Sequence, residues 1–178
     1  MIQTQKLTTQ QIGKLGELLV QYRLLSFGIE SAHLTTDSGI DLIAYAPSCE
    51  PVTIQVKANL KPKPGGGKGK AALDWWVPEN SPAKLFAFVD VSENRVWLFN
   101  RSQLEVSAQQ LSNGRFHLYM YTDQTVKRRK NTGVALLNEF DEFILENCID
   151  SLLQSNCIQQ SAEAGHGLLN PEIIEEII

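Results

Sequence analysis

Two short stretches, "SGIDLIAY" (residues 38–45) and "TIQVKAN" (residues 53–59), decide how the chain is expected to fold. Both are rich in aliphatic and β-branched residues, which favour strands. Polar side chains interrupt each of them: Asp41 in the first, and Gln55 and Lys57 in the second. The intervening "APSCEP" (residues 46–51) carries turn residues and is short enough for a hairpin. A hairpin closing around Ser48 places Asp41 opposite Gln55.

The polar interruptions are expected to share one face of this hairpin. Side chains alternate along a strand, so Gln55 and Lys57 lie on one side while Ile54 and Val56 point into the core. Directly opposed side chains have Cβ atoms about 4.5–5.5 Å apart and lie on the same side. A carboxylate, an amide oxygen and an ammonium group therefore converge. The alternative is an ordinary strand-edge acid beside a solvated sheet face.

Such a set of groups suits a divalent metal. Mg²⁺ takes one or two carboxylates and keeps several waters, so Asp41 would bind it directly and Gln55 would offer its side-chain oxygen. Lys57 would point at the same water or phosphate. Metal-activated water attacking a phosphodiester is chemistry that these residues can support.

A second carboxylate is expected from the first helix. Residues 7–28 have apolar residues at helical spacing, Thr8 or Thr9 as N-cap and Gly28 at the C-terminal stop. Glu17 shares one helical stripe with Gly13, Val20 and Leu24, an unusual place for a purely solvating acid. The other apolar stripe comprises Ile12, Leu15, Leu19 and Tyr22.

The order of the remaining segments predicts a mixed α/β fold. Strands are expected at about residues 29–34, 40–46, 52–59, 84–91, 95–100 and 115–122, with a helix near 102–111 and a flexible lysine-rich loop over 60–73. Apolar spacing from 133 to about 160 predicts one long amphipathic helix. We expect an α/β domain over residues 1–130, its sheet covered by helices, and an acidic helical extension over 131–178 packed on or next to it.

The distribution of charged residues also changes at residue 130. Residues 1–130 hold all 16 Lys and Arg and 11 acidic residues, whereas residues 131–178 hold 9 acidic residues and no basic ones. This asymmetry favours a polyanion partner for the first part, and a solvated surface with an acidic tail is the alternative.

Several classes of protein are not indicated. No apolar run approaches the roughly 20 residues of a membrane span, and the N-terminus lacks a signal-peptide pattern, so a cytoplasmic protein without membrane association is expected. The "PGGGKGKA" segment has Pro64 and Ala71 where a phosphate-binding loop needs Gly and Ser or Thr, which argues against a nucleotide cofactor. The three cysteines have no zinc spacing, and Cys148 lies on an apolar stripe, as a buried reduced thiol would.

The residues singled out above resemble the motif of the PD-(D/E)XK nuclease superfamily. Glu17 in "GKLGELLV", Asp41 in "DSGIDLIAY", and Gln55 with Lys57 in "IQVKAN" carry the resemblance over about residues 10–100. It is nearest to modified-DNA restriction endonucleases and archaeal-type Holliday junction resolvases, the former often having Gln in place of the second acid. The resemblance implies a restriction-endonuclease-like mixed sheet flanked by helices and Mg²⁺-dependent cleavage of DNA, with Mn²⁺ as a substitute.

The resemblance also implies a role for each residue. Asp41 would be the central metal ligand, Gln55 would occupy the second-acid position, and the carbonyl of Val56 would be a further ligand. Lys57 would orient or deprotonate the attacking water, and Glu17 would reach the metal, often through water. Because Gln55 is neutral, metal affinity should fall, and the rival interpretations are a weak or inactive DNA- or protein-binding module and a protein-interaction subunit.

DNA is the expected partner, and two basic clusters are its expected contacts. Lysines bind phosphates without reading sequence. One cluster follows the strand that carries Lys57, and the other lies in "VKRRK"; their members are Lys61, Lys63, Lys68, Lys70, Lys127, Arg128, Arg129 and Lys130. A homodimer is also expected, because cutting both strands usually needs two active sites. Trp75 or Trp76 is a candidate for stacking on a base, with core packing as the alternative.

Overall fold

The first helix packs one narrow stripe against the sheet. In the computed structural model, which describes residues 6–36, 38–47, 49–65, 69–126 and 135–151, α1 spans Thr9–Ser26. Thr8 and Gln11 form a reciprocal capping box, and Gly28 follows the helix with a φ of 74°, so both predicted ends are confirmed. Gly16, Val20 and Leu24 are buried. The other predicted stripe is only partly covered: Leu19 packs against this core, whereas Leu15 and Tyr22 are exposed.

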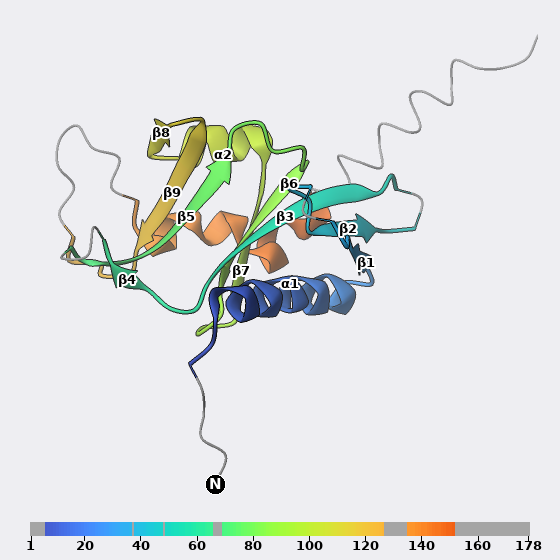
Figure 1. Ribbon diagram of the computed structural model, residues 1–178, viewed down its shortest axis with the longest axis horizontal. Helices are drawn as coiled ribbons and strands as arrows, with labels where there is room; N and C mark the ends of the chain where they lie inside the picture. The colour runs from blue at the N-terminus through green and yellow to red at the C-terminus, as the bar shows by residue number, and fades with distance from the viewer. Residues whose placement is uncertain (1–5, 37, 48, 66–68, 127–134, 152–178) are drawn as a thin grey trace, which may run out of the picture.

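The main sheet contains five strands, each close to its predicted position. They are β1 (Glu30–His33), β2 (Leu42–Tyr45), β3 (Val52–Asn59), β6 (Leu85–Asp90) and β7 (Arg95–Asn100), in the order β1-β2-β3-β6-β7. β3 and β6 run parallel, and the other neighbours are antiparallel, so the sheet is mixed. α1 runs along this sheet (Figure 1). The mixed α/β fold class is thereby confirmed.

A second sheet occupies part of the segment expected to be a flexible loop. It is antiparallel, in the order β4-β5-β9-β8, with β4 at Lys63–Pro64, β5 at Ala71–Pro78, β8 at Gln110–Ser112 and β9 at Arg115–Tyr121. The predicted helix near 102–111 is the shorter α2, Arg101–Ser107. β5 forms because seven of its residues pair with β9, an interaction between distant segments that local composition does not reveal.

Two hydrophobic cores result from this arrangement. On one face of the main sheet, Val20 and Leu24 of α1 pack on Ile54 and Val56. On the other face, Phe86 and Phe88 of β6 pack against Trp75 and other inward side chains of the second sheet. The two faces of the main sheet are therefore covered differently, one by helix and the other largely by the second sheet (Figure 1).

The start of the C-terminal segment packs on the domain in short pieces. Within the described residues, the expected long helix from 133 is wrong: a 3₁₀ helix, η2 (Leu137–Phe143), is followed by a bridge from Ile144 to Trp97 and then by helical residues 145–151. Phe140 enters the core between the sheets, whereas Leu145 enters the α1 core. A continuous helix would present one stripe to one surface, while these pieces reach both cores.

The cysteines differ in state. Cys148 is a free, buried thiol, as its apolar stripe predicts, and burial raises its pKa to about 11. Cys49 is disulfide-bonded.

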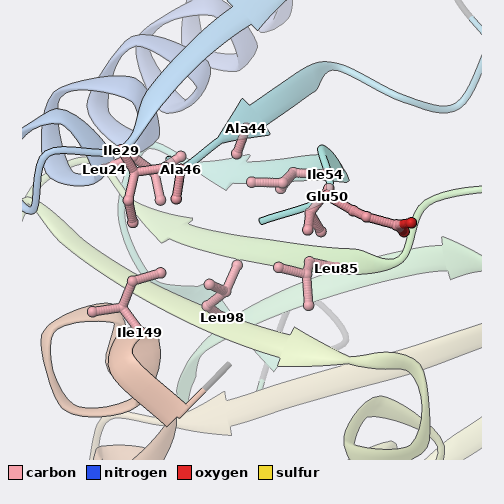
Figure 2. Close-up of a pocket in the computed structure, with 10 residues that line it drawn as sticks. Leu24, Ile29, Ala44, Ala46, Glu50, Ile54, Leu85, Leu98 and Ile149 are labelled. Carbon is pink, nitrogen blue, oxygen red and sulfur yellow. The ribbon is translucent and has the colours of Figure 1, made fainter. Parts of the chain in front are cut away.

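The core contains a cavity of about 20 Å³ between β2, β3, β7 and the ends of α1 and helix 145–151, shown in Figure 2. Its lining is apolar apart from Glu50, and its volume suffices for about one water molecule. It is a packing defect and too small for a substrate. No helix among the described residues is long and apolar enough to cross a membrane.

Candidate active site

The β2–β3 hairpin has the register expected from its turn. Leu42 pairs with Ile54 and Ile43 with Thr53, which centres the hairpin on position 48. This register, predicted from the turn, is confirmed up to Leu42, where β2 begins. The placement of Asp41 directly opposite Gln55 stays a prediction, because the N–H of Asp41 donates to the carbonyl oxygen of Ile54.

Asp41 is fixed by hydrogen bonds to the backbone of β3. Its own N–H donates to the carbonyl oxygen of Ile54 at 2.9 Å, and its Oδ2 accepts from the N–H of Val56 at 2.6 Å. Beyond the end of β2, the carboxylate therefore accepts a hydrogen bond from the backbone of β3 in place of a β2 carbonyl. A short hydrogen bond to a carboxylate is among the stronger ones in proteins, so the position of Asp41 is well defined.

The carbonyl of Val56 is directed to the same edge. In a strand, the N–H and C=O of one residue project to the same side, as paired residues that exchange both bonds illustrate. Since the N–H of Val56 meets Asp41, its carbonyl oxygen also projects from β3 toward the β2 side. The Asp41 carboxylate and the Val56 carbonyl thus both lie on the β2 side of β3. They are two of the metal ligands that the resemblance implies.

Gln55 is buried, contrary to the alternative of a solvated sheet face. It is 4% exposed and lies on the face of β3 that carries Phe86 in the neighbouring strand. Its Oε1 has no hydrogen-bond partner among the described residues. Leaving a buried polar atom unsatisfied costs about 1–3 kcal/mol, so a ligand or water at this oxygen would be stabilising.

A tight loop closes over Gln55. Gly39 has a φ of 78°, a conformation that favours glycine, and a Cβ there would lie 3.2 Å from Pro82 Cδ and 3.8 Å from Gln55 Nε2. The glycine of "SGID" therefore lets the chain pass close to the amide before it enters β2.

Lys57 lies two residues farther along the same face. It is half-buried and sits beside Phe88 of β6. Its ammonium group has no ion pair or hydrogen bond within the described part of the chain. A cation held among apolar neighbours in this way is available to an anionic ligand.

Glu17 belongs to a cluster that the sequence did not fully reveal. Its carboxylate lies 3.0 Å from Lys14 Nζ and 3.1 Å from His33 Nδ1, while Lys14 Nζ is 3.1 Å from either ring nitrogen of His33. His33 pairs with Leu42, next to Asp41, so the cluster adjoins the hairpin. The helical spacing of Lys14 and Glu17 was a usable signal, but the approach of His33 depends on the fold.

The donors present fit Mg²⁺ better than a softer ion. No group of three or more His, Cys, Asp and Glu side chains among the described residues could hold a metal. The oxygens in this region are the Asp41 carboxylate, which accepts from the N–H of Val56, the amide oxygen of Gln55 and the Val56 carbonyl. Mg²⁺ is commonly bound through one or two carboxylates with several waters retained, and this donor set matches that pattern.

The expected DNA-binding lysines are only partly placed. Lys61, Lys63 and Lys70 are exposed, and Lys70 lies 2.8 Å from Asp123, whose carboxyl pKa is held well below its ordinary value mainly by this hydrogen bond. Lys68 and the cluster Lys127, Arg128, Arg129 and Lys130 lie outside the described residues. The two tryptophans differ: Trp75 is buried in the core, and Trp76 faces outward.

Comparison with known proteins supports the fold. No family model matches the sequence, and no curated protein matches it significantly. Among solved structures, the bacterial homing endonuclease I-Ssp6803I is similar, with a TM-score of 0.55 and 14% sequence identity. The match covers 87% of this chain and 98% of that one. The chain therefore has a nuclease-like α/β fold shared with this endonuclease.

Proposed function

We propose that the protein is a metal-dependent endonuclease of the PD-(D/E)XK superfamily that hydrolyses DNA phosphodiester bonds. The observation that carries the proposal is the hydrogen bond from the Val56 N–H to the Asp41 carboxylate, beside Gln55, whose buried Oε1 has no hydrogen-bond partner among the described residues. The fold shared with a homing endonuclease supports the same class of reaction and suggests DNA as the partner.

Each residue has a role that follows from its position. Asp41, Gln55 Oε1 and the Val56 carbonyl would hold Mg²⁺, or Mn²⁺ in its place. When bound, the metal would supply Lewis acidity and favour ionisation of water. Lys57 would orient the attacking water and offset negative charge that develops on the phosphate. Glu17, held by Lys14 and His33, would act at longer range, through water.

A second candidate function is a nuclease-fold module that binds DNA or a protein with little or no cleavage. Gln55 favours it, because a neutral amide in place of an acid removes one negative charge from the metal site. A low metal affinity would then leave the exposed Lys61 and Lys63 to bind phosphates without hydrolysis.

A homodimer completes the proposal. α1 exposes apolar side chains three to four residues apart, with Leu18 49%, Tyr22 66% and Leu25 63% exposed. A second copy packed on this stripe would bury them and would bring two sites to one duplex. Light scattering that finds only monomer at high concentration would remove this part of the proposal.

The test is cleavage of supercoiled plasmid and of a four-way junction in Mg²⁺ or Mn²⁺, with EDTA as the blank. We expect metal-dependent cutting that Lys57→Ala abolishes and that Lys84→Ala leaves unchanged, because Lys84 is an exposed lysine whose nearest acid is Glu50 at 4.0 Å. DNA retardation without cutting would favour the binding module. If the protein neither cuts nor retards DNA, both the nuclease and the DNA-binding module are rejected.

A further inference from the structure

The outward face of the second sheet carries a row of aromatic rings that the proposed cleavage does not use. Alternation along β5 and β9 sends Trp75, Leu118 and Met120 into the core. The side chains between them point outward, and we call this set the outer aromatic face: Trp76, His117, Tyr119 and Tyr121.

The rings are arranged as a continuous series. Trp76 and His117 are direct cross-strand partners and stack with centroids 3.9 Å apart and planes 9° apart. The His117 and Tyr119 centroids are 5.3 Å apart, and those of Tyr119 and Tyr121 are 5.5 Å apart. Trp76 remains 39% exposed, although tryptophan usually buries most of its surface.

A hollow lies beside the row. It has a volume of about 320 Å³, within the range of small-ligand sites, and its floor includes the small Ala72 of β5. Tyr119 and Tyr121 form one wall, and Lys63 of β4 stands across Ala72 from them. Because the flat rings of Tyr119 and Tyr121 adjoin a compact hollow, the surface suits a planar ligand group better than an extended protein strand.

Polar groups surround the hollow at positions suited to a nucleotide. Asp74 and Gln110 line it and offer an acceptor and an amide, and Asp74 Oδ2 is 3.4 Å from His117 Nε2. Burial, reinforced by Tyr121, raises the pKa of Tyr119, so its hydroxyl remains a donor at neutral pH. Lys63 and the exposed Arg115 at opposite ends of the row supply positive charge.

We propose that the outer aromatic face binds unpaired nucleobases of a single-stranded polynucleotide. Bases stack on aromatic side chains irrespective of sequence, while flanking cations contact the phosphates, and this surface offers both. Cross-strand aromatic pairs also stabilise sheets, but that role does not require an adjoining hollow or an exposed Trp76.

The face is linked to the strand that carries the candidate site. Asn59, two residues after Lys57 on β3, donates from Nδ2 to the carbonyl oxygen of Asp74 at 2.6 Å. The end of β3 therefore lies next to β5, the strand that carries Trp76. The inference goes beyond cleavage, and it is tested in EDTA so that its failure is distinguishable from failure of the proposed nuclease.

The experiment measures fluorescence anisotropy of labelled 15-mer DNA, the same sequence as RNA, and the matched DNA duplex. We expect the single strands to bind more tightly than the duplex, and the DNA and RNA arms show which polynucleotide is preferred. Trp76→Ala and Tyr119→Ala should each weaken single-strand binding about 5- to 150-fold, the range measured for loss of one base-stacking ring. Trp76→Phe, which keeps a ring, should restore most of the affinity.

The control is Phe27→Ala, which removes a similarly exposed aromatic ring just after α1 (42% exposed, against 39% for Trp76), and it should leave binding unchanged. Circular dichroism confirms that each variant is folded. The proposal is overturned if the wild type binds no single strand, if Phe27→Ala weakens binding as much as Trp76→Ala does, or if binding depends only on salt and not on the rings.

Discussion

Gln55→Met tests the state of the buried amide oxygen. Methionine has a similar length and shape but no polar group, so the substitution removes the unsatisfied Oε1 without opening a cavity. In EDTA the variant should be more stable than the wild type by about 1–3 kcal/mol, the cost of an unsatisfied buried acceptor. For a chain of this size, 1 kcal/mol changes Tm by about 2–4 °C, so thermal unfolding resolves the effect.

Adding Mg²⁺ should narrow this difference in stability. A metal that binds only the folded state stabilises it by RT ln(1 + [L]/Kd), which is about 1.4 kcal/mol when the concentration is tenfold above Kd. The wild type should gain this stability, and Gln55→Met should gain clearly less because it lacks one ligand. The readout is Tm with and without Mg²⁺, independent of cleavage.

Asp41→Asn is the matched control for the charge. Asparagine can still accept from the N–H of Val56, so stability in EDTA should change little, while the Mg²⁺ response should disappear. The reasoning is refuted if Gln55→Met is less stable than the wild type in EDTA, or if Mg²⁺ stabilises both variants as much as the wild type.

Three further predictions concern packing, pH and DNA. Gly16→Ala should destabilise the protein by about 1–3 kcal/mol in denaturant unfolding, because its Cβ would come within 2.5 Å of a β3 methyl, whereas Gly13→Ala meets nothing within 4 Å and should stabilise by about 0.5–1 kcal/mol. Burial holds the pKa of Cys148 at about 11, above its unfolded value, so stability should fall as pH rises from about 9 through 11, and less steeply in Cys148→Ala. Lys61→Glu with Lys63→Glu should weaken duplex binding and reduce its salt slope by about 0.9 per lost phosphate contact; unchanged slopes would exclude these lysines from the interface.

The hairpin of the candidate site was predictable because its determinants are local. β3 and β7 begin and end where their apolar runs do, and the short turn segment between the predicted strands centres the pairing of β2 with β3 on position 48. Alternation likewise placed Gln55 and Lys57 on one face. These features follow from neighbouring residues alone.

The burial of Gln55 was not predictable, because it is imposed from a distance. The face that holds it is covered by elements that come much later in the chain, and the loop at Gly39 that approaches the amide also lies against Pro82. β5 was missed for a related reason: its first residues continue a Gly- and Lys-rich segment, and its pairing with β9 spans distant positions. The contact of His33 with Glu17 was also missed, because it is a tertiary contact between residues far apart in the sequence.

The parallel pairing of β3 with β6 has a consequence for protein synthesis. Every proposed catalytic residue lies before residue 58, yet β3 obtains its second neighbour only when β6 has been made, after β4 and β5. Non-local parallel pairing is slow to form because a loop must close first. A growing chain on the ribosome therefore carries Asp41 and Lys57 before the sheet that aligns them is complete, and DNA-cutting ability would arise only late in translation.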